Sequence, residues 1–328
     1  MSVRVARPGL LSTVQDLGRP GLQRHGVVVG GAMDTTALRI ANLLVGNAQD
    51  AAALEVTLLG PTLEFDGEHL FAIGGADLGA HLDREPVPPW RPCKAGPGSV
   101  LSFTGARSGC RAYVALAGGI DVPRVLGSRG TDLRAGIGGV GGRALAAGDV
   151  IAIGAPSTHA RRWLDELSAR ARRVAGWGAS RSLFAPSVPE PVIRVLRGLD
   201  HELFDAPSRA ALLEAVFQVS AQSDRMGYRL DGPRLTLEQP RELLSAPIAL
   251  GTVQVPPSGQ PIVLMADRHS VGGYPRIAQV ITADLPLLAQ AALGARVRFR
   301  EVTLAEAQTA YLERERDLRQ LAVAMQLR

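Results

Sequence analysis

Lysine is almost absent from this chain of 328 residues. Lys94 is the single lysine among 36 basic residues, and all the others are arginines. A Walker-type phosphate loop requires Gly-Lys-Ser/Thr, and a biotin carrier usually has Met-Lys-Met, whereas Lys94 lies in Arg-Pro-Cys-Lys-Ala-Gly. The sequence therefore excludes a Walker-type nucleotide site and predicts that no biotin is attached to this chain.

Cysteines, aromatic residues and long apolar runs are also scarce. Cys93 and Cys110 are too few for a disulfide framework and too far apart for a paired metal knuckle. Aromatic residues make up 4% of the chain and the arginines are spread along it, which disfavours nucleic-acid binding despite the net charge of +5. No run approaches the roughly 18 apolar residues of a membrane span. We expect a cytoplasmic protein that binds neither nucleic acid nor membrane.

Short apolar runs bounded by turn residues dominate both halves of the sequence. Examples are LEVTLLG, LFAIGG, SVLSFTG and RAYVALAGG, at a spacing of roughly ten residues that is typical of a barrel or a sandwich. Three prolines over residues 185–191 indicate an extended linker, because proline fixes its own φ and restricts the preceding residue. We therefore predict one domain over residues 1–185 and a second over 186–328.

A few helices accompany these strands. Asp34 is an N-cap for a helix that ends before Gly46, and a second amphipathic helix is expected over residues 160–174. A short helix is expected near residues 208–216, and Asp284 is expected to cap one more helix. Thr303 begins a Thr-Leu-Ala-Glu capping box ahead of a long amphipathic helix. We expect that helix to pack on its own domain rather than on a partner subunit. The predicted fold class is mainly β with peripheral helices.

Common catalytic and metal-binding motifs are missing or misplaced. The run from Gly136 to Gly141 matches G-x-G-x-x-G, but no apolar strand precedes it and no acidic residue follows about 20 positions later. We interpret it as a close-packing loop. The six histidines have no zinc-site spacing, and no Gly-x-Ser-x-Gly elbow is present. The sequence therefore predicts neither a metal site nor a serine-hydrolase site.

Polar residues instead gather in a few clusters among turn signals. These are TVQDLGRPG, GGAMD, GSRGTDLRAG, SDRMGYRLDG and ADRHSVGGYPR. The rigid fork of arginine suits bidentate binding of a carboxylate or phosphate, and a neighbouring aspartate can orient that fork. Each cluster alone fits a structural turn network, and together they indicate an anionic ligand. The predicted anion-binding residues are Arg225, Ser223, Tyr228, Arg129, Thr131, Asp132 and Asp34.

The same clusters resemble the allophanate hydrolase subunit 2 family of biotin-dependent carboxyltransferases. The resemblance is carried by TVQDLGRPG, GVVVGGAMD, ALEVTLLGP, GSRGTDL, SDRMGYRL and GTVQVPPSGQPIVLMADR with GGYPRIA, in order from Val3 to about Phe299. One departure is that His269 and Ser270 stand where the family pattern has Gln and Thr. The resemblance implies a tandem pair of cyclophilin-like β-barrel domains.

Three functions follow from this resemblance. The favoured one is the C subunit (PxpC/KipA-like) of an ATP-dependent 5-oxoprolinase, which opens 5-oxoproline to glutamate with a subunit-1 partner (PxpB/KipI-like) and a PxpA-like protein. Alternatives are the carboxyltransferase half of a urea carboxylase and a KipA-like regulatory binding protein. ATP and Mg²⁺ are implied for the complex as a whole.

The resemblance and the chemistry of lactam opening also suggest catalytic residues. An unactivated lactam is a poor electrophile, so negative charge that develops during activation needs preorganised cations. Arg225 and Arg268 are candidates for holding a phosphate or a carboxylate. Asp267 is expected to orient Arg268 or to help bind Mg²⁺, and Tyr274 to donate a hydrogen bond to the substrate. The predicted catalytic set is therefore Asp267, Arg268 and Tyr274.

Overall fold

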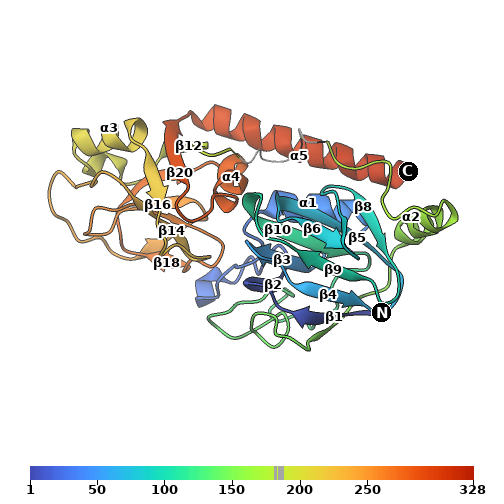
Figure 1. Cartoon of the computed structure of the whole chain (residues 1–328). Helices are drawn as coiled ribbons and strands as arrows, with labels where there is room; N and C mark the ends of the chain where they lie inside the picture. Colours follow the sequence, from blue (N-terminus) through green and yellow to red (C-terminus); the bar gives the residue numbers. More distant parts are fainter. Residues whose placement is uncertain (181–182, 184–187) are drawn as a thin grey trace. The chain divides into compact units, whose positions relative to one another are not determined.

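The computed structural model describes residues 1–180, 183 and 188–328, and it shows a mainly β protein with few helices (Figure 1). The predicted domain boundary at 185/186 and the start of the predicted linker lie outside the described residues. The chain divides into two compact units. The first unit comprises residues 1–18, 30–184 and 316–328, and the second comprises residues 19–29 and 185–315.

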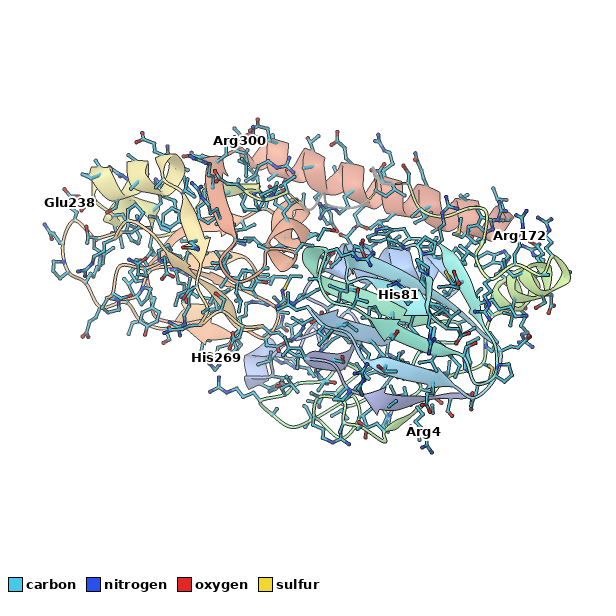
Figure 2. All side chains as sticks on the ribbon, viewed as in Figure 1. Arg4, His81, Arg172, Glu238, His269 and Arg300 are labelled. Atoms are coloured by element: carbon cyan, nitrogen blue, oxygen red, sulfur yellow. The ribbon has the colours of Figure 1, made fainter. Side chains whose placement is uncertain are left out.

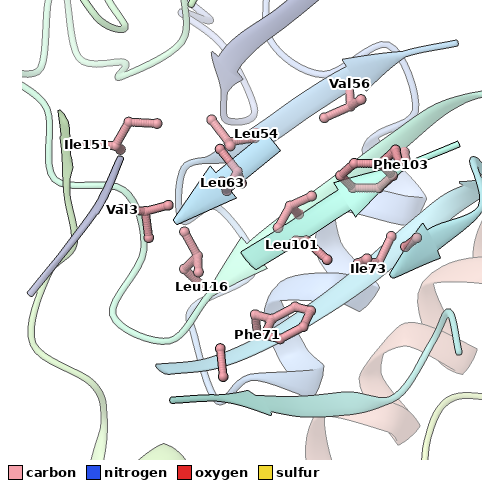
Figure 3. Packing of buried hydrophobic residues seen from close by; sticks show 14 of the residues in the cluster. Val3, Leu54, Val56, Leu63, Phe71, Ile73, Leu101, Phe103, Leu116 and Ile151 are labelled. Atoms are coloured by element: carbon pink, nitrogen blue, oxygen red, sulfur yellow. The ribbon is translucent and has the colours of Figure 1, made fainter. Parts of the chain in front are cut away.

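Two antiparallel sheets form the first unit. Its strands are β1 (Ser2–Arg7), β2 (Leu11–Gln15), β3 (Ala53–Thr57), β4 (Thr62–Phe65), β5 (His69–Asp77), β6 (Ala80–Leu82), β7 (Glu85–Pro86), β8 (Pro92–Ala95), β9 (Val100–Phe103), β10 (Ser108–Leu116) and β11 (Val150–Ala152). One sheet has the order β11-β1-β4-β9-β6-β7 and the other the order β2-β3-β10-β5-β8. Both sheets contribute to one apolar core, with Phe71 and Ile73 from β5 and Leu101 and Phe103 from β9 (Figure 3). Burial of each such side chain contributes about 1.5–3 kcal/mol.

The helices of the first unit cover the outer face of the second of these sheets. They are α1 (Thr35–Leu44), α2 (Thr158–Ala169) and the last part of α5 (Leu304–Leu327). The predicted helix after Asp34 is confirmed, since the Asp34 carboxylate accepts a hydrogen bond from Ala37 N. Leu318 and Leu321 of α5 are 1% and 8% exposed and join the same apolar cluster as α1.

The second helix ends earlier than the sequence predicts. We expected it to continue to residue 174, but α2 ends at Ala169 and Ala171 has a φ of +49°. Val174 instead forms a β-bridge with Cys93, so the chain leaves the helix to extend the edge of the sheet at β8.

A closed barrel forms the second unit. Its strands are β12 (Val192–Arg197), β13 (Phe217–Val219), β14 (Gly227–Asp231), β16 (Thr252–Gln254), β17 (Ile262–Leu264), β19 (Arg276–Val280) and β20 (Arg296–Glu301). Their order is β12-β19-β16-β17-β14-β13-β20, and the parallel pairing of β20 with β12 closes the barrel. A short ribbon pairs β15 (Ala246–Pro247) with β18 (Val271–Gly272). Buried and exposed side chains alternate along β20, since Val297 and Phe299 are buried, Arg298 between them is partly exposed, and the flanking Arg296 and Arg300 are exposed.

The α-helices in the described part of this unit are α3 (Ala206–Glu214), α4 (Leu285–Ala289) and the first part of α5. The predicted capping box is confirmed, because Thr303 N donates to Glu306 Oε2 (2.7 Å) and Glu306 N donates to Thr303 Oγ1 (3.2 Å). The predicted side-chain cap by Asp284 is wrong, because that carboxylate binds Arg194 instead, at 2.7 Å from Nη2.

The fold class is thus mainly β with few helices, as expected. The closed barrel occurs in the second unit, whereas the described part of the first unit consists of two stacked sheets.

Candidate functional site

Asp16 holds together the loops of the first unit that the sequence singled out. Its carboxylate accepts hydrogen bonds from Gly18 N (2.8 Å), Ser128 Oγ (2.6 Å) and Arg129 N (2.6 Å). Asp16 is 7% exposed and Ser128 is fully buried, so these bonds form away from water. The cluster TVQDLG therefore anchors the cluster GSRGTDL.

The predicted anion-binding residues of the first unit have internal roles. Arg129 donates to Asp121 Oδ1 (2.9 Å) and to the Val122 carbonyl (2.8 Å). Asp132 Oδ1 accepts hydrogen bonds from the amides of residues 134 and 135, which is an Asx-turn arrangement. Asp34 caps α1, as described above. These three side chains build turns and helix ends, so the structure does not gather them around an open anion site.

Thr131 is fully buried, and the glycine-rich loop packs against it. A Cβ on Gly139 would lie 2.0 Å from Thr131 Oγ1, and Gly139 has a φ of +52°. Thr131 Oγ1 has no hydrogen-bond partner among the described residues. The interpretation of residues 136–141 as a close-packing loop therefore agrees with the geometry.

A buried polar network on β3 and β10 was not predicted from the sequence. Glu55 is 2% exposed and accepts hydrogen bonds from Tyr113 Oη (2.7 Å) and Met33 N (2.8 Å). Tyr113 Oη in turn accepts from Asp34 N (2.8 Å), and Arg111 Nε lies 4.0 Å from Glu55 Oε1. The pKa of Tyr113 is raised well above its ordinary value. Burial is the largest cause, and the negative charge of Glu55 is the next. The sequence feature that could have indicated this network is Glu55, a charged residue inside the apolar run LEVTLLG.

In the second unit, Arg225 and Asp267 form a bidentate ion pair. Arg225 Nε lies 2.8 Å from Asp267 Oδ2, and Nη2 lies 2.9 Å from Oδ1. The two side chains are 6% and 13% exposed. Asp267 N also donates to the Arg225 carbonyl (2.8 Å), which extends the pairing of β14 with β17 and brings the two side chains together. We expected Asp267 to orient Arg268 or to help bind Mg²⁺; the arginine that it pairs with is Arg225.

Arg268 follows immediately and has no acidic partner among the described residues. Its backbone N donates to the Met265 carbonyl (3.2 Å), and its Nη1 lies 3.5 Å from the same oxygen. Its Nε is buried and has no hydrogen-bond partner within the described ranges. Burial of the guanidinium lowers the pKa of Arg268 from its ordinary value. An arginine stays protonated in proteins, so Arg268 is a half-buried cation. No carboxylate of the described chain forms an ion pair with it.

The remaining predicted residues of the second unit divide into packed and exposed groups. Tyr228 is 2% exposed and donates to the Ala291 carbonyl (3.2 Å). Ser223 Oγ accepts from Arg229 N (3.1 Å) and donates to Arg229 O (3.2 Å), which closes a turn. Tyr274 is 48% exposed. Arg268 and Tyr274 are therefore the predicted residues best placed to meet a ligand.

A cavity of about 300 Å³ in the first unit is lined in part by Trp163, Trp177 and Arg170, and none of the predicted site residues lines it. Within the described residues, no group of three or more His, Cys, Asp and Glu side chains could hold a metal ion. No helix of the described chain has the length and apolar character needed to span a bilayer.

Comparison with known proteins gives a consistent result. Residues 25–301 match the family described as carboxyltransferase domain, subdomain A and B. The chain is 44% identical over 322 residues to the C subunit of 5-oxoprolinase from Escherichia coli (strain K12), which covers 98% of this chain and 97% of that one. It is 42% identical to the C subunit of 5-oxoprolinase from Haemophilus influenzae, over 90% of each chain. The crystal structure of the K. lactis urea amidolyase superimposes with a TM-score of 0.88 at 28% identity, covering 98% of this chain and 20% of that protein.

Proposed function

Because the chain belongs to the carboxyltransferase domain, subdomain A and B, family, we propose that it is the C subunit of an ATP-dependent 5-oxoprolinase. The observation that carries this proposal is the 44% identity to the E. coli subunit over nearly the whole of both chains. The Haemophilus relative of the same name supports it. The reaction would be the opening of the lactam ring of 5-oxoproline to give glutamate.

The chain would act in a complex with other subunits. We assign it a subunit-1-like partner, bound through an interface of roughly 2,000 Å² or more, as permanent complexes usually have. A PxpA-like protein is the other partner. ATP, with Mg²⁺, supplies the activation that an unreactive amide requires. We assign both to the complex as a whole. The isolated chain is expected to be inactive.

Within this chain, we propose that the loop from Asp267 to Tyr274 faces the substrate. The bidentate pair of Arg225 with Asp267 fixes one end of the loop on the barrel. At the other end, Gln254 Nε2 donates to the Tyr274 carbonyl (3.1 Å). Arg268 and Tyr274 lie between or beside these anchors. We assign the other predicted residues to the framework rather than to ligand contact, because each has an internal partner or, for Thr131, packs against the glycine-rich loop.

Two finer assignments accompany this proposal. We infer that both units are cyclophilin-like domains, which the barrel of the second unit supports. We also infer a cytoplasmic location, supported by two cysteines that are buried and not disulfide-bonded.

Replacement of the E. coli subunit tests the function. The chain is purified and added to an E. coli 5-oxoprolinase preparation that lacks its own C subunit, and ATP-dependent glutamate release from 5-oxoproline is measured. We expect activity only when the chain and the other subunits are all present. Glutamate release by the chain alone would contradict the proposal. So would a complete mixture that releases no more glutamate than the mixture without the chain.

A second candidate function is carboxyl transfer to urea. The observation that favours it is the TM-score of 0.88 with the K. lactis urea amidolyase, although the chain spans a fifth of that protein. It would need a biotin carrier on another chain, since Lys94 is not in a carrier motif. Urea-dependent consumption of carboxybiotin by the chain and its subunit-1-like partner, with no activity on 5-oxoproline, would favour this function.

A further inference from the structure

We propose that Arg268 binds the carboxylate of the substrate and thereby makes the complex select 5-oxoproline over neutral lactams. This inference rests on the proposed function, because it identifies which group of that substrate the barrel recognises. The ligands that fit this arginine share an anionic oxygen group, and the experiment separates a carboxylate from a phosphoryl group.

The first support is the division of charge between two neighbouring arginines. Arg225 is neutralised by Asp267 through two hydrogen bonds of 2.8 and 2.9 Å. The acidic side chain of this loop is therefore engaged in a pair that is largely buried. The loop retains one arginine, Arg268, whose charge no described carboxylate neutralises at 4.0 Å or less.

The second support is the state of the Arg268 side chain itself. It is half-buried, its Nε has no partner within the described ranges, and its single hydrogen bond there is a long one of 3.5 Å to the Met265 carbonyl. A buried donor without an acceptor is unfavourable, and the penalty is larger for a charged group. A bound carboxylate would remove that penalty, because the guanidinium fork presents two parallel N–H donors to two oxygens.

The third support is that the rest of the loop is both anchored and accessible. A Cβ on Gly272 would lie 2.8 Å from Gln254 Nε2, so the glycine allows the glutamine to reach the Tyr274 carbonyl. His269 is exposed and Tyr274 is 48% exposed. Figure 2 labels His269 at the surface of the barrel, on the opposite side of this unit from Arg300. The loop after Arg268 is therefore open to solvent at His269 and Tyr274, while Arg268 itself is half-buried.

The substrate has one group that matches this site. 5-Oxoproline differs from the neutral lactam 2-pyrrolidinone by its carboxylate alone. A ligand without the matching anion gains nothing from a desolvated cation, because the cation stays unpaired, whereas a carboxylate ligand gains the ion pair. Arg268 would thus determine specificity rather than take part in bond cleavage.

The test measures both substrates with the assembled complex. The variants are Arg268→Gln, Arg268→Lys and, as a matched control, Arg300→Gln, which removes an exposed arginine of β20. We expect Arg268→Gln to raise the KM for 5-oxoproline by about tenfold or more, with kcat and the KM for ATP changed less than about twofold. The kcat/KM for 2-pyrrolidinone should not change, Arg268→Lys should restore part of the loss, and Arg300→Gln should match the unmodified chain.

Other outcomes would overturn the inference. An unchanged KM for 5-oxoproline in Arg268→Gln would do so, and a rise confined to the KM for ATP would assign the arginine to a phosphoryl group. Loss of complex formation on size-exclusion chromatography, with an unchanged melting temperature, would assign it to a partner's carboxylate. Equilibrium binding of 5-oxoproline and 2-pyrrolidinone to the complex without ATP gives the same comparison if turnover is absent. A failure of the unmodified chain to support glutamate release would count against the proposed function instead.

Discussion

The ion pair between Arg225 and Asp267 allows a quantitative test of how the site loop is held. Three variants form a double-mutant cycle: Arg225→Met, Asp267→Leu and the double substitution. Removal of one member of a buried pair leaves the other charge uncompensated and typically costs about 3–5 kcal/mol. The exposures of 6% and 13% place this pair near that range, with the lower end favoured because the aspartate keeps some water.

The double substitution should cost much less than the sum of the two single ones. Apolar replacement of a whole buried pair is often close to neutral, so we expect a coupling energy of about 2–3 kcal/mol. Hydrogen exchange of peptides from β14 and β17 measures the opening free energy where the pair lies. Tryptophan fluorescence is the control measurement. It reports on the first unit, because Trp90, Trp163 and Trp177 all belong to that unit, whereas the ion pair lies in the second.

Two results would refute this reasoning. Single substitutions that each lower the opening free energy by less than about 1 kcal/mol would show that the pair behaves like an exposed surface pair. Costs that simply add in the double variant would show that the two side chains do not depend on each other.

Three further predictions concern pH, thiol reactivity and backbone strain. Desolvation raises the pKa of Asp200, but hydrogen bonds from Arg276 outweigh it and leave the pKa below its ordinary value. The contribution of this carboxylate to the free energy of unfolding should therefore be complete above about pH 4 and be lost on further acidification. Melting curves of Asp200→Asn should show a lower melting temperature at pH 7 and a smaller loss between pH 5 and 2; an equal loss would exclude this pair as a cause. Burial raises the pKa of Cys93 to about 12, so its thiol should react with Ellman's reagent at pH 8 only after unfolding, and rapid native labelling would be inconsistent with this. Gly139→Ala should destabilise the chain by about 1–3 kcal/mol, seen as a lower melting temperature, because its Cβ would overlap the Thr131 hydroxyl; an unchanged melting temperature would mean that this loop can relax.

Local signals in the sequence predicted much of the secondary structure. The Asp34 cap and the Thr303 capping box each involve residues within three positions of one another, so the sequence contains the whole interaction. Asp284 shows the limit of such reasoning. Its carboxylate binds Arg194, which is 90 positions away, and no local pattern reveals that a distant arginine competes for a capping side chain.

The candidate site shows the same limit. The sequence identified Arg225, Asp267 and Arg268 as members of an anion-binding set, but it linked the two neighbours 267 and 268. The structure pairs residues 42 positions apart because β14 and β17 are adjacent in the barrel. Strand adjacency therefore decides which arginine is neutralised and which remains, and composition and spacing do not specify strand adjacency.

The burial of Leu318 and Leu321 in the first unit has a consequence for synthesis of the chain. Residues 1–184 leave the ribosome long before residues 316–328, yet the apolar cluster around α1 includes side chains from both segments. Until residues 316–328 have been synthesised, the apolar surface that they cover on α1 and its sheet is exposed to water. A fragment ending near residue 185 should therefore aggregate more readily than the full chain, because it lacks the side chains that cover this cluster.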